Sequence, residues 1–136
     1  MNGIPRRIGK PMPTSEPSRT FLPGDVVKVP FPYTDRPTRQ RRPALIVSSP
    51  DLQRGHGLSW VLMITSAANR GWEGDVDIAD ITLAGLPAPS VVRTAKIATI
   101  DSRDADHLGR VSVEVLQLVQ RHLDAILRSD DPQQDR

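Results

Sequence analysis

The placement of proline most limits what this chain can fold into, because ten of its 13 prolines lie within the first 50 of 136 residues. Proline lacks a backbone N–H and fixes its own φ, so closely spaced prolines disfavour helix. The first third of the chain is therefore expected to hold strands, turns and a disordered segment. Residues 50–58 (PDLQRGHGL) are expected to form a loop.

Apolar residues at period two predict a first strand from Asp25 to Phe31 (DVVKVPF), which ends among prolines as an edge strand or strand end does. Residues 33–41 are polar and turn-like, and residues 79–84 suit one helical turn. Trp60 lies in an apolar run and is expected in the core. Further strands are predicted over residues 44–47, 60–64, 74–78, 90–93 and 96–100, the last two being either separate or one bent strand.

A helix is predicted over residues 112–128. Ser112 is suited to cap its N-terminus and Glu114 to interact with the helix dipole. Its apolar residues recur at helical spacing, at Val115, Leu116, Val119, Leu123, Ile126 and Leu127. Several short strands and one late helix predict a mainly β fold, a small β-barrel with an appended C-terminal helix. The barrel domain is expected over residues 21–128, between disordered tails at 1–20 and 129–136.

Composition excludes several kinds of site. The chain has no cysteine, which rules out disulfides, thiolate metal sites and a cysteine nucleophile and fits a reducing cytoplasm. Its three histidines are widely spaced, so we expect no zinc or other metal site and no cofactor. No apolar run reaches the length of a membrane span, so no membrane association is expected.

Positive charge is concentrated at one end of the chain. Residues 1–42 hold nine Lys and Arg against three acids, a net charge of +6, whereas the remaining residues have a net charge of −4. Four arginines fall within the loop Arg36–Arg42, between two predicted strands. Arginine can donate two parallel hydrogen bonds to phosphate, so the loop either binds a polyanion or is a solvated hairpin tip.

Other polar residues suggest a site less strongly. Thr65 and Ser66 end a predicted strand and could hold a phosphate oxygen, although both residue types are common at such positions. Trp72, beside Arg70 in a glycine-flanked loop, is the better candidate for stacking on a base. Arg93 either extends a phosphate track or pairs with a nearby acid. Asp101 is expected to accept a hydrogen bond at a turn, the plainer alternative being a strand-end Asx turn.

The segments GDVVKV (24–29) and RPALIV (42–47), taken together, resemble the opening of the MazF/PemK family. In that family a Gly-Asp-x-Val strand is followed by a variable loop and then by Arg-Pro-Ala/Val and an aliphatic strand. Residues 60–65 resemble its third strand, which ends in Thr. Residues 90–101 resemble its later segment, which ends in Ile/Val-Asp. The resemblance covers residues 23–127.

The resemblance implies an SH3-like barrel, a homodimer, and a toxin that cleaves single-stranded RNA and is held inactive by a cognate antitoxin. Arg42 and Thr65 match its catalytic residues. Cleavage would use the RNA 2′-hydroxyl and no metal, leaving a 2′,3′-cyclic phosphate and a 5′-hydroxyl. The residues expected to contact RNA are Arg36, Thr38, Arg39, Gln40, Arg41, Ser66, Trp72 and Arg93.

The chain departs from the family in its basic loop. Many members carry an acid before the arginine, whereas this loop has none after Asp35, so the general base is unassigned. Two alternatives follow. One is a catalytically inert barrel that binds RNA or protein. The other is a CcdB-like poison of DNA gyrase, which the chain's ending disfavours because it lacks that family's terminal Trp-Gly-Ile.

Overall fold

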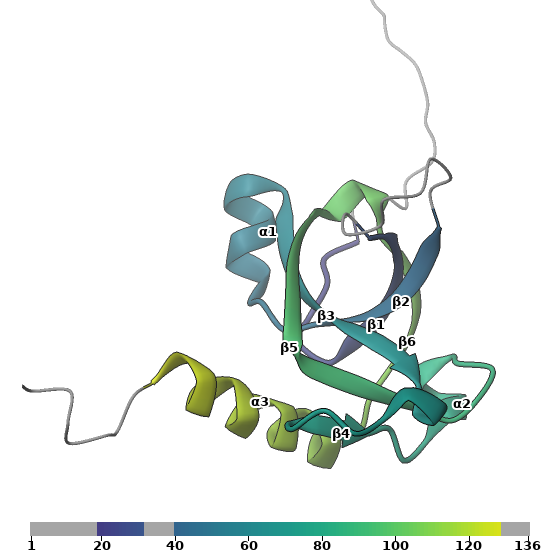
Figure 1. Ribbon diagram of the computed structural model, residues 1–136. Coiled ribbons are helices and arrows are strands. Elements are labelled where there is room, and N and C mark those ends of the chain that lie inside the picture. Colours follow the sequence, from purple (N-terminus) through teal and green to yellow (C-terminus); the bar gives the residue numbers. More distant parts are fainter. Residues whose placement is uncertain (1–18, 32–39, 129–136) are drawn as a thin grey trace, which may run out of the picture.

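Six antiparallel strands form a single curved sheet in the computed structural model, which describes residues 19–31 and 40–128 (Figure 1). The strands are β1 (Asp25–Pro30), β2 (Arg41–Ile46), β3 (Leu58–Ser66), β4 (Asp75–Asp77), β5 (Ser90–Asp101) and β6 (Asp106–Arg110). Their order in the sheet is β4-β5-β3-β2-β1-β6. Within the described residues β4 and β6 are not paired with each other, so hydrogen bonding leaves the sheet open. The predicted mainly β fold with a C-terminal helix is confirmed.

Buried side chains form two clusters because alternate residues of each strand point to opposite faces. The first cluster includes Leu45, Leu62 and Ile64, and α3 (Val113–Leu127) packs on it through Val115 and Val119. The second lies on the other face and includes Val29, Ala44 and Val61. Figure 1 shows α3 running along one side of the curved sheet. Between register shifts, such as the one in the β3–β5 pairing at Leu62/Met63, a strand residue can therefore be assigned to a face by its parity.

The predicted C-terminal helix is confirmed. The Ser112 hydroxyl caps it by accepting from the N–H of Val115 at 3.2 Å, and Glu114 lies in its first turn. Val119 is fully buried, whereas Ile126 and Leu127 are exposed. The apolar stripe thus continues past the region that the sheet covers. No helix in the described part of the chain is long and apolar enough to span a membrane.

Residues 50–58 are not the predicted loop, because α1 (Pro50–His56) forms there. Proline is tolerated in the first turn of a helix, where its missing N–H would have no helical partner. The Ser49 hydroxyl accepts from the N–H of Asp51, and Gly57 ends the helix at φ 70°. The remaining elements are the short helix α2 (Ile81–Ala84) and the 3₁₀ turns η2 (Ala67–Asn69) and η3 (Ser102–Asp104).

Three further predictions need correction or completion. Residues 90–101 form one continuous strand, and β6 was not predicted, since its sequence DHLGR shows no apolar alternation. Trp60 is not in the core: its side chain is 46% exposed, at the edge of the face on which α3 packs. The predicted tails lie outside the described residues, except for Arg19 and Thr20.

Candidate functional site

Paired strands place a row of side chains across one face of the sheet. Val27 pairs with Ala44, Ala44 with Met63, Met63 with Arg93, and Arg93 with Asp75. Directly paired residues share a face, so this row runs from β1 to β4 on the face of the second cluster. Arg42 and Thr65 lie one pair beyond this row, beside Val29 of the second cluster.

Arg42 and Thr65 come to the same end of this face. Arg42 lies two residues before Ala44 in β2, and Thr65 lies two residues after Met63 in β3. Strand alternation gives both side chains the parity of the Ala44–Met63 pair. On the outer sides of these two strands, Arg42 pairs with Val29 of β1 and Thr65 pairs with Val91 of β5. The sheet thus brings together two residues that are 23 positions apart in sequence.

Arg42 is half-buried, and its Nη2 donates to Oε1 of Gln40 at 3.3 Å. Arg41 has the opposite parity and is held elsewhere. Its Nη2 lies 2.6 Å from Oδ2 of Asp106 and also donates to the carbonyls of Lys28 and Asp104. Two adjacent arginines therefore have different surroundings, which sequence could not distinguish. Three predicted RNA contacts, Arg36, Thr38 and Arg39, lie outside the described residues.

Thr65 and Ser66 end β3 with different hydrogen bonds. The Thr65 hydroxyl oxygen accepts from Nδ2 of Asn69 at 3.0 Å. The Ser66 hydroxyl accepts from the N–H of Ala68 at 3.2 Å and so caps η2. Ser66 thus has a local structural role, whereas Thr65 is tied to a side chain that sequence analysis did not single out. The pattern Ser-x-x-Asn after a strand could have indicated this turn.

Arg93 forms a nearly buried ion pair with Asp75, the second of the two predicted alternatives for this residue. Its Nε and Nη2 donate to the two carboxylate oxygens at 3.1 and 2.9 Å, and the side chains are 9% and 8% exposed. Its guanidinium carbon also lies 4.2 Å from the ring centre of Trp72, which is 48% exposed. Arg93 is a diagonal neighbour of Thr65 across β3 and β5, so the pair borders the candidate site.

Asp75 is the acidic side chain of this pair, and its environment favours the charged form. The hydrogen bond from Arg93 lowers the pKa of Asp75 below its ordinary value, and the backbone N–H groups of Trp72 and Gly71 act in the same direction. The same contact raises the pKa of Arg93. A carboxylate held in this way is a weak base, so Asp75 is poorly suited to accept a proton during a reaction.

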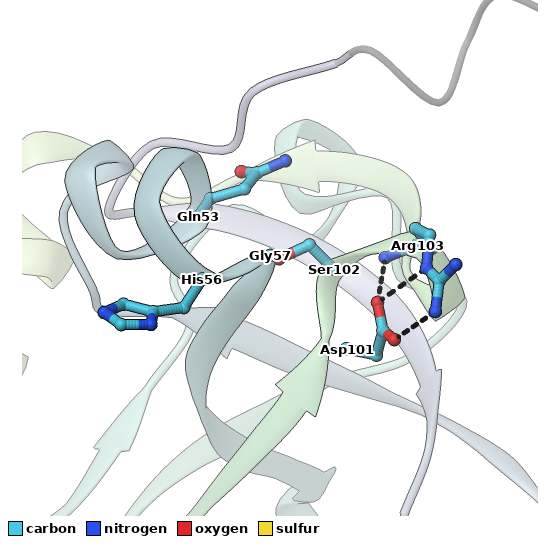
Figure 2. A pocket seen from close by; sticks show the side chains of 6 residues that line it. All are labelled: Gln53, His56, Gly57, Asp101, Ser102 and Arg103. Carbon is cyan, nitrogen blue, oxygen red and sulfur yellow. Dashed lines mark hydrogen bonds and ion pairs between the residues drawn. The ribbon is translucent and has the colours of Figure 1, made fainter.

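Away from the Arg42–Thr65 end, a polar hollow lies where α1 meets the end of β5 (Figure 2). Arg103 binds Asp101 through its side chain and its backbone N–H, and this lowers the pKa of Asp101 to about 2. The predicted turn at Asp101 is thereby confirmed, since Asp101 caps η3. In Figure 2 the His56 ring points away from this pair. Asp101 and Arg103 therefore neutralise each other at this hollow, and we do not assign a reaction to them.

The chain is thus a small mainly β protein with one curved antiparallel sheet, a C-terminal helix and a candidate site at the β2–β3 end. A family model described as PemK-like, MazF-like toxin of type II toxin–antitoxin system matches residues 22–127. The chain belongs to this family. No curated protein matched the chain.

Solved structures show the same fold. MazF from Deinococcus radiodurans is 26% identical with a TM-score of 0.65, over 81% of this chain and 98% of that one. A MazE–MazF structure from the same organism is 26% identical with a TM-score of 0.66, over 80% and 97% of the two chains. An endoribonuclease in complex with its cognate antitoxin, from a mycobacterial species, is 21% identical with a TM-score of 0.60, over 79% and 93%.

Proposed function

We propose that this toxin cleaves single-stranded RNA without a metal, by attack of the RNA 2′-hydroxyl on the adjacent phosphorus. The observation that carries the proposal is the placement of Arg42 and Thr65 at the same end of one sheet face, at the positions that resemble the family's catalytic residues. The products would be a 2′,3′-cyclic phosphate and a 5′-hydroxyl. Such a reaction needs no protein nucleophile, only alignment, charge stabilisation and proton transfer.

Arg42 is assigned to the charge that develops on the phosphate. A guanidinium is planar and permanently charged, so it can stabilise the oxygens of the transition state and donate a hydrogen bond to the leaving 5′-oxygen. Water takes the proton of the 2′-hydroxyl and supplies the proton of the leaving oxygen. Thr65 is assigned to a non-bridging phosphate oxygen, to which its hydroxyl would donate. Trp72 presents an exposed ring on which a base could stack. Arg41 and Arg93 each have a carboxylate partner, so their positive charge is largely compensated locally.

Incubation of the purified protein with a long single-stranded RNA in EDTA tests the proposal. We expect discrete fragments that carry 5′-hydroxyl ends, because the attacking group belongs to the RNA. The same RNA with 2′-deoxy nucleotides should be bound and left intact. Binding of RNA without cutting would favour the inert barrel instead, and gyrase-dependent DNA breaks would favour the gyrase poison.

A cognate antitoxin is the second expected partner. Several structural neighbours are named as MazE–MazF structures, and another is named as an endoribonuclease in complex with its cognate antitoxin. We propose that an acidic, partly disordered segment of such a partner covers the basic surface around Arg42 and so blocks RNA. The cytoplasm, where messenger RNA is translated, is the proposed place of action.

We also propose a homodimer. An apolar groove between β3, α1 and the end of α3 is lined by Trp60, Leu123, Ile126 and Leu127, among others. Trp60, Ile126 and Leu127 are 46%, 59% and 79% exposed, which is unusual for large apolar side chains grouped on one surface. A second copy of the chain would bury them.

Trp60→Glu is expected to shift the protein from dimer to monomer, as measured by light scattering after size exclusion. A charge placed in an apolar interface is costly when it has no partner. Val113→Glu is the matched control, because Val113 is 65% exposed in the first turn of α3 and outside the groove. A monomeric wild type, or equal dissociation in both variants, would contradict the proposal.

A further inference from the structure

A short turn returns the chain over the end of β3. Ser66 caps η2, and the turn brings Asn69 back to Thr65, four residues earlier, with 3.0 Å between Nδ2 and Oγ1. This contact is made on the exposed side of the site, where Asn69 itself is accessible. Asn69 is exposed, so its amide does not contribute to the buried core.

The direction of this hydrogen bond decides what Thr65 can do. A hydroxyl has one hydrogen to donate and two lone pairs to accept with. Because Asn69 donates, it occupies a lone pair of Thr65 and leaves the hydroxyl hydrogen available for another acceptor. A non-bridging phosphate oxygen is such an acceptor. The amide therefore sets Thr65 as a donor rather than an acceptor toward the phosphate.

The turn is anchored to the buried ion pair. Nη2 of Arg93 donates to the backbone carbonyl of Asn69 at 2.7 Å, while the same guanidinium is held by Asp75. Asp75 also accepts from the N–H groups of Gly71 and Trp72, which follow the turn. Each charged group has several hydrogen bonds, as a pair with little solvent exposure requires. An accessible turn is thus fixed by a pair that is only 9% and 8% exposed.

We propose that Asn69 is a positioning residue for RNA cleavage, which acts by orienting the hydroxyl of Thr65, and that the Arg93–Asp75 pair holds it there. The proposal rests on the proposed function, in which Thr65 donates to the phosphate. It assigns to the Arg93–Asp75 pair a role in holding the site rather than in contacting RNA.

The test measures single-turnover cleavage, binding of 2′-deoxy RNA and the melting temperature for each variant. Asn69→Ala is expected to slow cleavage by about tenfold, the rate equivalent of one hydrogen bond. Its RNA affinity and Tm should stay at the wild-type values, because Asn69 would act on the hydroxyl and not on the substrate or the core. Thr65→Val should lose more, since it removes the donor itself.

Asn69→Asp gives the sharper result. Its carboxylate can only accept, so it would take the hydrogen of the Thr65 hydroxyl and remove the donor to phosphate. We expect a larger loss of rate than in Asn69→Ala. Ala68→Asp is the matched control, because it adds the same charge one position away on an exposed residue. The control should weaken RNA binding without a comparable loss of the single-turnover rate.

The outcomes separate the two proposals. If the wild type cuts RNA and Thr65→Val does not, but Asn69→Ala cuts at the wild-type rate, the role of Asn69 is overturned and the function stands. A loss in Asn69→Ala that appears only as weaker binding or lower Tm also overturns the role. If the wild type binds RNA without cutting it, the proposed function fails, and this role fails with it.

Discussion

Replacing Arg42 with alanine is expected to reduce RNA cleavage by at least about 100-fold, with little change in the affinity for uncleavable RNA. The reason is that a charge aimed at the transition state acts on the rate more than on ground-state binding. Arg42 is half-buried on the face shared with Thr65, and within the described residues its guanidinium donates to the neutral side chain of Gln40. Single-turnover cleavage together with binding of 2′-deoxy RNA measures both quantities.

Arg41→Ala is the matched control, one residue away. Its guanidinium is bound to Asp106 and to two backbone carbonyls, on the other side of β2. We expect this variant to weaken RNA binding modestly and to keep most of the cleavage rate. The cleavage rate of Arg42→Lys should lie between those of the wild type and Arg42→Ala, because lysine keeps the positive charge but lacks the planar set of N–H donors of the guanidinium. Equal losses in Arg41→Ala and Arg42→Ala would count against a special role for Arg42.

Replacing Asp75 with alanine is expected to lower the free energy of unfolding by about 3 kcal/mol, because it leaves the guanidinium of Arg93 with little solvent and no anion. The carboxylate accepts two hydrogen bonds from Arg93 and two from backbone N–H groups. The effect should be visible as a lower midpoint in urea unfolding with an unchanged slope.

Asp77→Ala is the matched control on the same strand. Asp77 lies 3.5 Å from Arg70, and these side chains are 70% and 59% exposed. An exposed pair contributes about 0–1 kcal/mol, so this variant should unfold near the wild-type midpoint. Replacing Asp75 and Arg93 together with apolar residues should cost less than Asp75→Ala alone, since no unpaired charge is left. Similar losses in Asp75→Ala and Asp77→Ala would refute the importance of burial here.

The same pair predicts a dependence on pH. The folded pKa of Asp75 lies below the ordinary value of 3.8. Its contribution is therefore complete above the unfolded pKa and is lost as the pH falls through the folded pKa. The difference in stability between the wild type and Asp75→Asn should be constant from about pH 7 to pH 5 and shrink below about pH 4. A difference that widens on acidification would contradict this account.

Much of the fold could be predicted from local sequence. Alternation from Asp25 and the helical spacing after Ser112 identified β1 and α3, because both elements bury one face of their own residues. The helix α1 is not evident from the sequence because proline disfavours helix, although Ser49 and Gly57 are suited to cap a short helix that begins at Pro50. The strand β6 was missed for a different reason. Its pairing with β1, rather than its own apolar residues, makes it a strand.

The candidate site, like the fold, could be predicted from the sequence only in part. The sequence by itself pointed to Arg42 and Thr65 as a pair, through segments that resemble a known family. It could not show what holds Arg41, nor choose between RNA and an acid as the partner of Arg93. Those choices depend on which strands are neighbours, since Asp106 and Asp75 reach these arginines only across β1–β6 and β4–β5 pairing.

The basic loop shows most clearly what the sequence determines and what the tertiary structure determines. Charge and proline are properties of consecutive residues, so the sequence alone established a basic segment between two strands. Which arginine faces the site is a matter of strand parity and of contacts with residues more than 60 positions away. Only the folded sheet brings those groups within hydrogen-bonding distance, and it thereby leaves Arg42, rather than Arg41, on the face that carries Thr65.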